Sequence, residues 1–328
     1  MTRRVLITDS IDPSGDALLA SHGAEPVRAP DGTPDTVRRL AAGCDALIIR
    51  GRMPDDIFDA APRLRAVTIH GTGTDLVPMD SANRHGVAVA NLPGINAQSV
   101  AEYCAMALLM LARKAPQVTA AMRTQSWDEA RSLGAEVFEL AGMTAGIVGV
   151  GEIGRRTAKI LRDGFGMTVL GNQRRLDALP EGVAPAALDE LVAESDFIVV
   201  TAPLTRETRH LFDAARIARM KPAAWLVNVG RGPVIDEAAL VDALRARRIA
   251  GAMLDVYEQY RIGPDHELFR LDNVILTPHL AGMTRQSRAR AAVVAARETL
   301  RMLEGERPTH FVNPDCWSRF RERRPQDR

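Results

Sequence analysis

Three glycines near the middle of the chain have the spacing of a phosphate-binding turn. Gly149, Gly151 and Gly154 lie between a short apolar run, which predicts a buried strand, and a helical pattern. The first glycine permits a tight turn, the second lets the backbone approach a pyrophosphate, and the third lets helix and strand pack closely. Because a helix N-terminus favours an anion, we expect a dinucleotide site that includes Glu152 and Ile153. The alternative is a glycine-rich turn in another kind of α/β protein.

The end of the next predicted strand, Met167–Gly171, indicates which dinucleotide is bound. Proteins that use NAD hold the adenosine ribose with an acidic residue about 20 residues after the glycines. Here Gln173 stands at that position, and Arg174 and Arg175 follow it. No carboxylate is present to repel a 2′-phosphate, and two guanidiniums would bind one. We therefore expect NADP(H) to be preferred and NAD(H) to be possible. If both arginines are solvated, the protein would accept either.

Length and composition exclude several classes of function. The 328 residues are enough for one large or two ordinary domains, and 46% of them are hydrophobic. A formal net charge of +1 argues against nucleic acid or a membrane surface as the main partner. The three cysteines form no CxxC pair, which favours reduced thiols. We find no signal-peptide pattern, no membrane-spanning run and no metal site, so we expect a cytoplasmic enzyme.

Short apolar runs alternate with helical patterns along the whole chain, which predicts parallel sheets covered by helices. The helical patterns include Ser14–His22, Thr33–Gly43, Pro54–Ala61, Ser99–Lys114, which is followed by Pro116, and Thr284–Leu303. Between the two halves we expect a more irregular arm over Val118–Gly142, and we expect the Arg-rich tail to be disordered. The predicted strands are Val5–Thr8, Ala46–Ile49, Ala66–Ile69, Val87–Ala90, Ala145–Val150, Met167–Gly171, Phe197–Val200, Trp225–Asn228, Gly251–Asp255 and Val274–Leu276.

From about Ala46 to Pro314 the chain resembles the D-isomer-specific 2-hydroxyacid dehydrogenases, which include hydroxypyruvate and glyoxylate reductases and phosphoglycerate dehydrogenase. Several ordered motifs at the family's spacing carry the resemblance, and together they are far more specific than any one alone. Besides the glycine turn, they are Gly71-Thr-Gly-Thr-Asp75, Asn91-Leu-Pro-Gly94, Ser99-Val-Ala-Glu102, Ala202-Pro-Leu-Thr205, Val227-Asn-Val-Gly-Arg-Gly232, Asp255-Val-Tyr257 and Thr277-Pro-His279.

The resemblance implies two doubly wound parallel-sheet domains. A Rossmann cofactor domain, residues 100–282, would be inserted into a flavodoxin-like substrate domain formed by residues 1–99 and 283–328. The active site would lie in the cleft between the domains, and the family is usually homodimeric through the cofactor domain. The resemblance also implies further cofactor-binding residues, namely Ala202, Pro203, Thr208, Val229, Gly230 and Asp255.

Reduction of a 2-keto acid needs a proton donor at the carbonyl oxygen and a cation to polarise the carbonyl. A lone histidine after a strand is more often structural, but the family motif favours His279 as the proton donor, since its pKa lies near neutral. Arg231 follows the predicted strand Trp225–Asn228, at the sheet edge where α/β proteins bind ligands. Its guanidinium can bond carbonyl and carboxylate oxygens, the alternative being a solvated arginine between two glycines.

The substrate carboxylate would be bound by backbone N–H groups of the turn formed by Gly71, Thr72 and Gly73. Arg50, just after a predicted strand, would contact the far end of the substrate unless it is an ordinary surface arginine. His70 would face the nicotinamide or the substrate, and a structural histidine is an equal alternative.

The chain departs from the family at the catalytic carboxylate. The family places a Glu five residues after the Asp of its Asp-Val motif, where it pairs with the His and raises the pKa of that His. This chain has Tyr260 there, followed by Arg261, and Glu258 is not assumed to substitute. Tyr260 can orient an imidazole by a hydrogen bond, but it is neutral near pH 7 and cannot stabilise an imidazolium as a carboxylate does. We therefore expect His279 to titrate lower than in relatives with the Glu, which moves reduction toward more acidic pH.

Two alternatives to a 2-keto acid reductase follow from this departure. One is a nucleotide-binding regulatory or interaction protein with weakened catalysis, against which the presence of Arg231 and His279 argues. The other is a dehydrogenase that transfers hydride without a proton, as formate dehydrogenases do, although those have Gln at the position of Tyr260. Arg261 would add a cation for a second anionic group on the substrate if it faces the cleft rather than solvent.

Overall fold

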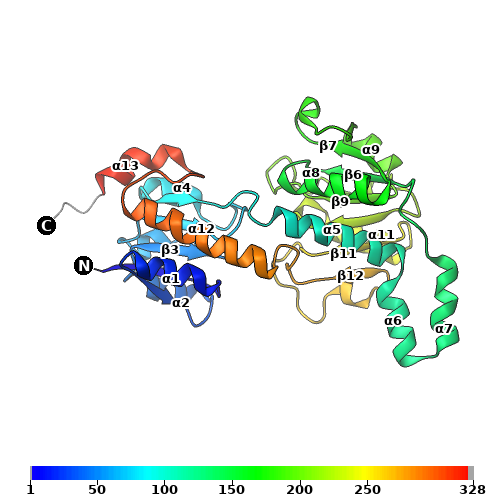
Figure 1. The fold of residues 1–328 in the computed structure, drawn as a ribbon, viewed down its shortest axis with the longest axis horizontal. Coiled ribbons are helices and arrows are strands. Elements are labelled where there is room, and N and C mark those ends of the chain that lie inside the picture. The colour runs from blue at the N-terminus through cyan, green and yellow to red at the C-terminus, as the bar shows by residue number, and fades with distance from the viewer. Residues whose placement is uncertain (1, 324–328) are drawn as a thin grey trace. The chain divides into compact units, whose positions relative to one another are not determined.

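The computed structural model describes residues 2–323, which form two compact units (Figure 1). The first unit contains the chain up to Asn96 and from Met283 onward, and the second contains Ala97–Gly282. Each unit is a parallel sheet with helices on both faces, so the predicted α/β class with two doubly wound sheets is confirmed.

The sheet of the first unit has the strand order β2-β1-β3-β4-β5, the flavodoxin-like order. Its central strands are almost wholly apolar because both faces are covered. Helices α1 and α12 pack on one face, in front of the sheet in Figure 1, and α2, α3 and α4 pack on the other. The strands are β1 (Arg3–Ile7), β2 (Ala24–Arg28), β3 (Ala46–Ile49), β4 (Ala66–Ile69) and β5 (Ala88–Ala90), and the helices are α1 (Pro13–Ser21), α2 (Pro34–Ala41), α3 (Ile57–Ala60), α4 (Met79–Arg84) and α12 (Arg285–Leu303).

The sheet of the second unit has the order β12-β11-β10-β9-β6-β7-β8, with all neighbouring strands parallel. This is the Rossmann order extended by one strand at the β12 edge. Helices α5 and α8 pack on one face, and α9, α10 and α11 pack on the other. The strands are β6 (Thr144–Val148), β7 (Thr168–Asn172), β8 (Ala184–Pro185), β9 (Phe197–Val200), β10 (Trp225–Asn228), β11 (Gly251–Leu254) and β12 (Val274–Leu276), and the helices are α5 (Ala97–Ala112), α8 (Glu152–Lys159), α9 (Leu188–Glu194), α10 (Ala214–Ile217) and α11 (Glu237–Arg245).

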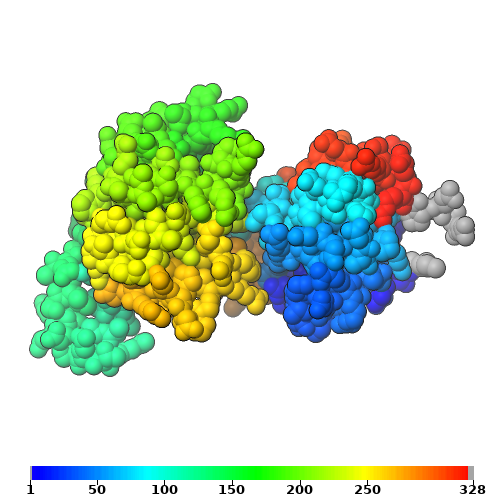
Figure 2. Space-filling model, turned by 180° about the vertical axis from the view of Figure 1, so that it is seen from behind, coloured from blue at the N-terminus to red at the C-terminus, as the bar shows by residue number. Residues whose placement is uncertain are grey.

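The arm that the sequence predicts as irregular is helical. It forms α6 (Ala115–Thr124) and α7 (Trp127–Ser132), which extend as a hairpin beyond the rest of the second unit (Figures 1 and 2). Lys114 has a left-handed φ of 47° and separates α5 from α6. Pro116 therefore lies in the first turn of α6 rather than just after the end of α5. At this position its missing N–H loses no hydrogen bond of the helix.

The expectation of a disordered tail is wrong for its first half. Helix α13 (Trp317–Glu322) packs on the first unit through Phe320, which is fully buried in the apolar core of that unit. Residues 324–328 lie outside the described part. The remaining helical turns are the 3₁₀ turns η1 (Leu133–Glu136), η3 (Leu176–Ala178), η4 (Gly232–Val234), η5 (Glu267–Arg270) and η6 (Pro314–Cys316) and the π turn η2 (Ile160–Gly164).

Two chemical features concern the described residues as a whole. The cysteines Cys44, Cys104 and Cys316 are buried free thiols. No helix among residues 2–323 is both long and apolar enough to span a bilayer.

Candidate functional site

The glycine turn after β6 has the conformation that a phosphate-binding turn requires. Gly149 has a φ of +94°, and a Cβ there would lie 2.6 Å from the backbone N of Ala202. A Cβ on Gly154 would lie 2.5 Å from the carbonyl oxygen of Gly149, whereas one on Gly151 would meet nothing within 4 Å. No side chain caps the N-terminus of α8 at Gly151. The first turn of α8 therefore has both space and backbone donors for an anion.

This turn lies where the strand order of the sheet reverses, between β6 and β9, which is where doubly wound sheets bind nucleotides. Thr201 ties the two loops together, because its Oγ1 donates to the carbonyl oxygen of Gly149 at 2.5 Å. The segment after it closes on itself, since Thr208 Oγ1 donates to the carbonyl oxygen of Pro203 at 2.7 Å. Ala202 thus lies next to the glycine turn, and Pro203 and Thr208 belong to the closed segment that follows it. Thr201 was missed by sequence reasoning.

Gln173, Arg174 and Arg175 follow β7, the strand next to β6. Gln173 Nε2 donates to the carbonyl oxygen of Arg175 at 2.8 Å, which turns the segment back on itself. Both arginines are exposed, and within residues 2–323 neither guanidinium forms a hydrogen bond or ion pair. Two cations are therefore available at the strand end where an adenosine ribose would lie.

The turn that carries Arg231 is organised by Asn228 at the end of β10. Asn228 is 1% exposed, its Nδ2 donates to the carbonyl oxygen of Arg231 at 3.1 Å, and its Oδ1 accepts from the backbone N of Gly230 at 3.1 Å. Arg231 Nη1 donates to the carbonyl oxygen of Gly230 at 2.9 Å. Val229 continues from β10 and is mostly buried. Sequence reasoning missed Asn228, and a polar residue that ends a buried strand is the signal that would have found it.

The loop that carries His279 is built around Asp255, which is 1% exposed. The Asp255 carboxylate accepts hydrogen bonds from Thr277 Oγ1 (2.6 Å), Leu280 N (2.8 Å) and Ala281 N (2.9 Å). The backbone N of His279 donates to the carbonyl oxygen of Asp255 at 2.9 Å. His279 itself has a φ of 54°, a conformation that costs free energy for a non-glycine residue and is concentrated at functional sites. Asp255 thus holds the loop that carries His279 in its conformation, which is a structural role separate from its expected role in cofactor binding.

Tyr260 lies against His279. The two rings meet edge to face with centroids 5.8 Å apart, and Tyr260 is 60% exposed. Tyr260 follows β11, which lies between β10 and β12, the strands that precede Arg231 and His279. Because the strands are parallel, the loops with Arg231, Tyr260 and His279 leave neighbouring strands at one edge of the sheet. This is also the edge that carries the glycine turn.

The candidate substrate residues lie in the first unit, also after strands. Arg50 follows β3 next to β1, where that sheet reverses its order, and its Nη1 donates to the carbonyl oxygen of Ser10 at 3.0 Å. His70 follows β4, and its Nε2 is buried without a hydrogen-bond partner among the described residues. Burial, and next the charge of Arg50, lower the pKa of His70 to about 4, so its imidazole is neutral near pH 7.

The predicted anion-binding turn is only partly available. The N–H of Gly71 already donates to the carbonyl oxygen of Ile69 at 2.8 Å, so a carboxylate would have to share or replace this bond. The backbone N–H groups of Thr72 and Gly73 donate to no other group in the described part of the chain. Thr72 Oγ1 donates to the carbonyl oxygen of Leu92 at 3.3 Å, which holds the turn in place.

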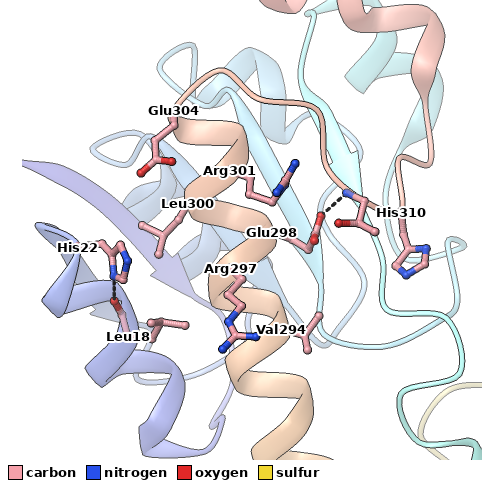
Figure 3. Close-up of a pocket in the computed structure, with 10 residues that line it drawn as sticks. Leu18, His22, Val294, Arg297, Glu298, Leu300, Arg301, Glu304 and His310 are labelled. Carbon is pink, nitrogen blue, oxygen red and sulfur yellow. Dashed lines mark hydrogen bonds between the residues drawn. The ribbon is translucent and has the colours of Figure 1, made fainter.

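A cavity of about 600 Å³ in the first unit involves none of these residues. It is lined by α1, α12 and the loop with Thr309 and His310 (Figure 3), and its walls carry charges of both signs, among them Arg297 and Glu298. Glu298 is 5% exposed and accepts a hydrogen bond from the backbone N of Thr309 at 2.6 Å. Residues 2–323 contain no group of three or more His, Cys, Asp or Glu side chains that would hold a metal ion.

Comparison of the chain with known proteins identifies the family to which it belongs. The sequence profile for the "D-isomer specific 2-hydroxyacid dehydrogenase, NAD binding domain" matches residues 105–281. The chain is also 38% identical over 283 residues to a glyoxylate reductase of Thermofilum pendens. The match covers 83% of this chain and 82% of the relative. The chain belongs to the D-isomer-specific 2-hydroxyacid dehydrogenases.

Two solved structures that are similar to this chain carry nicotinamide cofactors. The NADPH-dependent glyoxylate/hydroxypyruvate reductase of Sinorhizobium meliloti, in complex with NADP and malonate, has a TM-score of 0.82 and 28% identity over 95% of this chain and 97% of that one. The NAD-dependent formate dehydrogenase of Staphylococcus aureus, in complex with NAD, has a TM-score of 0.83 and 27% identity over 93% and 96%. Membership of the family therefore gives the chain a nicotinamide cofactor and NAD(P)-linked oxidoreduction of 2-hydroxy acids.

Proposed function

We propose that this dehydrogenase reduces small 2-keto acids to D-2-hydroxy acids and prefers NADPH. The first unit would be the substrate-binding domain and the second the cofactor domain, in a cytoplasmic homodimer. The observation that carries the proposal is that Arg231 and His279 leave parallel strands at the same sheet edge as the glycine turn. A reductase needs a cation and a proton donor beside its cofactor, and a protein that only binds a nucleotide needs neither.

In this proposal each residue has one task. A reduced nicotinamide bound at the glycine turn would supply the hydride for the carbonyl carbon. Arg231 bonds the carbonyl and carboxylate oxygens and so stabilises the negative charge that develops on the carbonyl oxygen. His279 then gives that oxygen its proton, and its imidazole takes a proton back from solvent.

The residues of the first unit would hold the substrate. The backbone N–H groups of Thr72 and Gly73 have no acceptor among residues 2–323 and would bind the carboxylate. The unpartnered Nε2 of His70 would bond a bound molecule, and a neutral imidazole can donate or accept there. Arg50 would contact the far end of the substrate. The formate dehydrogenase alternative is disfavoured because Tyr260 cannot replace the carboxamide of the Gln found there.

The test is the initial rate of NADPH and NADH oxidation against a panel of 2-keto acids, from glyoxylate and hydroxypyruvate to dicarboxylic, phosphorylated and aromatic members. We expect turnover that falls by about 10²- to 10⁴-fold in His279→Ala. The Glu194→Ala variant, which removes an exposed carboxylate from the end of α9, should keep the wild-type rate. If the cofactor binds but no acid turns over, and Tyr260→Glu restores nothing, the regulatory alternative replaces the enzyme.

A further inference from the structure

The segment that carries Tyr260 and Arg261 is held at both of its ends by one carboxylate. Glu237 is the first residue of α11, and its side chain is only 17% exposed. Its Oε2 accepts a hydrogen bond from the backbone N of Glu258 at 3.0 Å. Its Oε1 lies 3.1 Å from Nε2 of His266. The two oxygens therefore join residues that are eight positions apart in the chain.

The tautomer of His266 defines the second of these contacts. His266 Nδ1 accepts a hydrogen bond from the backbone N of Leu268, as the N-cap of η5. A ring nitrogen that accepts carries no proton, so Nε2 bears the proton and donates it to Glu237. His266 is itself fixed at the start of η5, so the bond to Glu237 ties the segment to a rigid element at that end.

Between these two ends the segment has few other attachments. Gln259, Tyr260 and Arg261 are exposed, and Ile262 packs against the apolar core of the second unit. The contact of Tyr260 with His279 is an edge-to-face ring contact, which contributes only about 0.5–1.5 kcal/mol beyond the area it buries. The place of Tyr260 therefore depends on how the ends of the segment are held.

The first end of the segment also lies against the turn that carries Arg231. A Cβ on Gly232 would lie 1.7 Å from the carbonyl oxygen of Tyr257, so the two backbones are in direct contact. The side chain of Glu258 is held from a third loop, because Arg209 Nη2 donates to its Oε1 at 3.0 Å. A shift of Glu258 would thus disturb the surroundings of both Arg231 and His279.

From these contacts we propose that Glu237 is a positioning residue, whose carboxylate closes residues 258–266 into a fixed loop and keeps Tyr260 against His279. The inference rests on the proposed function only for its effect on catalysis. The closure of the loop is a property of the fold, and it can be measured without any substrate.

The experiment measures trypsin cleavage after Arg261, an exposed bond inside the loop, by mass spectrometry of the native protein. Loss of Glu237 removes two hydrogen bonds that involve a charged group, so we expect Glu237→Ala to raise the rate of cleavage at this bond more than about tenfold. His266→Ala removes only the attachment at the second end of the loop and leaves the sequence of α11 unchanged. It should raise the rate of cleavage after Arg261 by less. Asp242→Ala is the matched control, since Asp242 lies on the same helix and, in the part of the chain that is described, its carboxylate pairs with the exposed Arg245.

Two further variants separate positioning from simple stabilisation of α11. Glu237→Asp keeps a negative charge at the helix N-terminus but is one methylene shorter, so it should keep the wild-type Tm and still expose Arg261. In steady-state kinetics, Glu237→Ala should raise KM for the 2-keto acid and lower kcat, and should leave KM for the cofactor unchanged. A uniform loss of active protein would leave both KM values unchanged.

The outcomes distinguish this inference from the proposed function. If cleavage at Arg261 is equally slow in wild type, Glu237→Ala and Asp242→Ala, all folded by circular dichroism, the inference is wrong even if the enzyme turns over. If cleavage accelerates but no 2-keto acid is reduced by the wild type, the loop closure stands and the proposed function falls. If Glu237→Ala does not fold, His266→Ala decides.

Discussion

At the scale of single residues, the candidate site has a phenol ring beside an imidazole. His279 is contacted by the ring of Tyr260, which stands where the resemblance to the family implies a carboxylate. A ring contact holds the imidazole in place but adds no negative charge, so it cannot stabilise the imidazolium. The ring of Tyr260 therefore positions the imidazole without placing a charge beside it.

This difference predicts that Tyr260→Glu moves the pH dependence of reduction upward. A carboxylate beside the imidazole would favour its protonated form, so the proton donor would persist to higher pH. We expect the alkaline limb of kcat/KM for reduction to shift by about 1 pH unit or more. Tyr260→Phe is the control, since it keeps the ring and removes only the hydroxyl. An alkaline limb at the same pH in all three proteins would contradict the prediction.

His70 predicts a pH dependence of stability. Its pKa is lowered to about 4 in the folded chain, chiefly by burial, from an ordinary value of 6.5. Between these two pH values the unfolded chain binds a proton that the folded chain does not, so the free energy of unfolding falls as the pH falls. The largest loss attributable to His70 is about 3 kcal/mol. Urea unfolding of wild type and His70→Asn at pH 7 and pH 4.5 measures it. An equal loss in both proteins would show that His70 is not the cause.

At the scale of elements, the sequence predicted those that are buried and periodic and missed those whose stability depends on tertiary contacts. Strand β2 contains Pro26 and is only partly buried, so neither composition nor alternation marks it. Helices α6 and α7 lack a clear apolar stripe, and Pro116 suggested an end where it marks a start.

The same limit applied to the candidate site. Spacing predicted the residues at the strand ends, because strand and loop positions follow from the apolar runs. It did not predict that the N–H of Gly71 is already bonded, nor that Asn228 and Glu237 support the loops. These are contacts between segments far apart in the chain, and no local pattern encodes them.

The loop after β7 predicts the cofactor preference. Arg174 and Arg175 are exposed and free of ion pairs in the described structure, so a 2′-phosphate would have two cations to bind. We expect Arg174→Ala/Arg175→Ala to raise KM for NADPH by at least about tenfold and to leave KM for NADH within about twofold. Arg219→Ala, an exposed arginine after α10 that pairs with Asp189, is the control. Comparable KM values for both cofactors in the wild type would refute the preference.

At the scale of the whole molecule, the two units have separate cores, and the chain passes between them near Asn96 and again near Gly282. The candidate residues are divided in the same way. Arg50 and His70 belong to the first unit, and Arg231 and His279 belong to the second. The proposed carboxylate-binding groups and the proposed proton donor therefore belong to different units of the chain.

The second unit also carries the surface that would make the molecule a dimer. Large apolar side chains are exposed on α5, α6 and α7, and the last two helices extend beyond the unit (Figure 2). Leu109 is 39%, Met122 48% and Trp127 66% exposed, values that favour burial against a second copy.

We expect light scattering to give twice the chain mass of 35.7 kDa for the wild type and for Phe269→Glu, an exposed aromatic residue in η5. The pair Leu109→Glu/Trp127→Glu should give the mass of one chain, because two carboxylates in an apolar interface cost several kcal/mol. A wild type that is monomeric at every concentration, or a charged pair variant that remains dimeric, would exclude this surface as the interface.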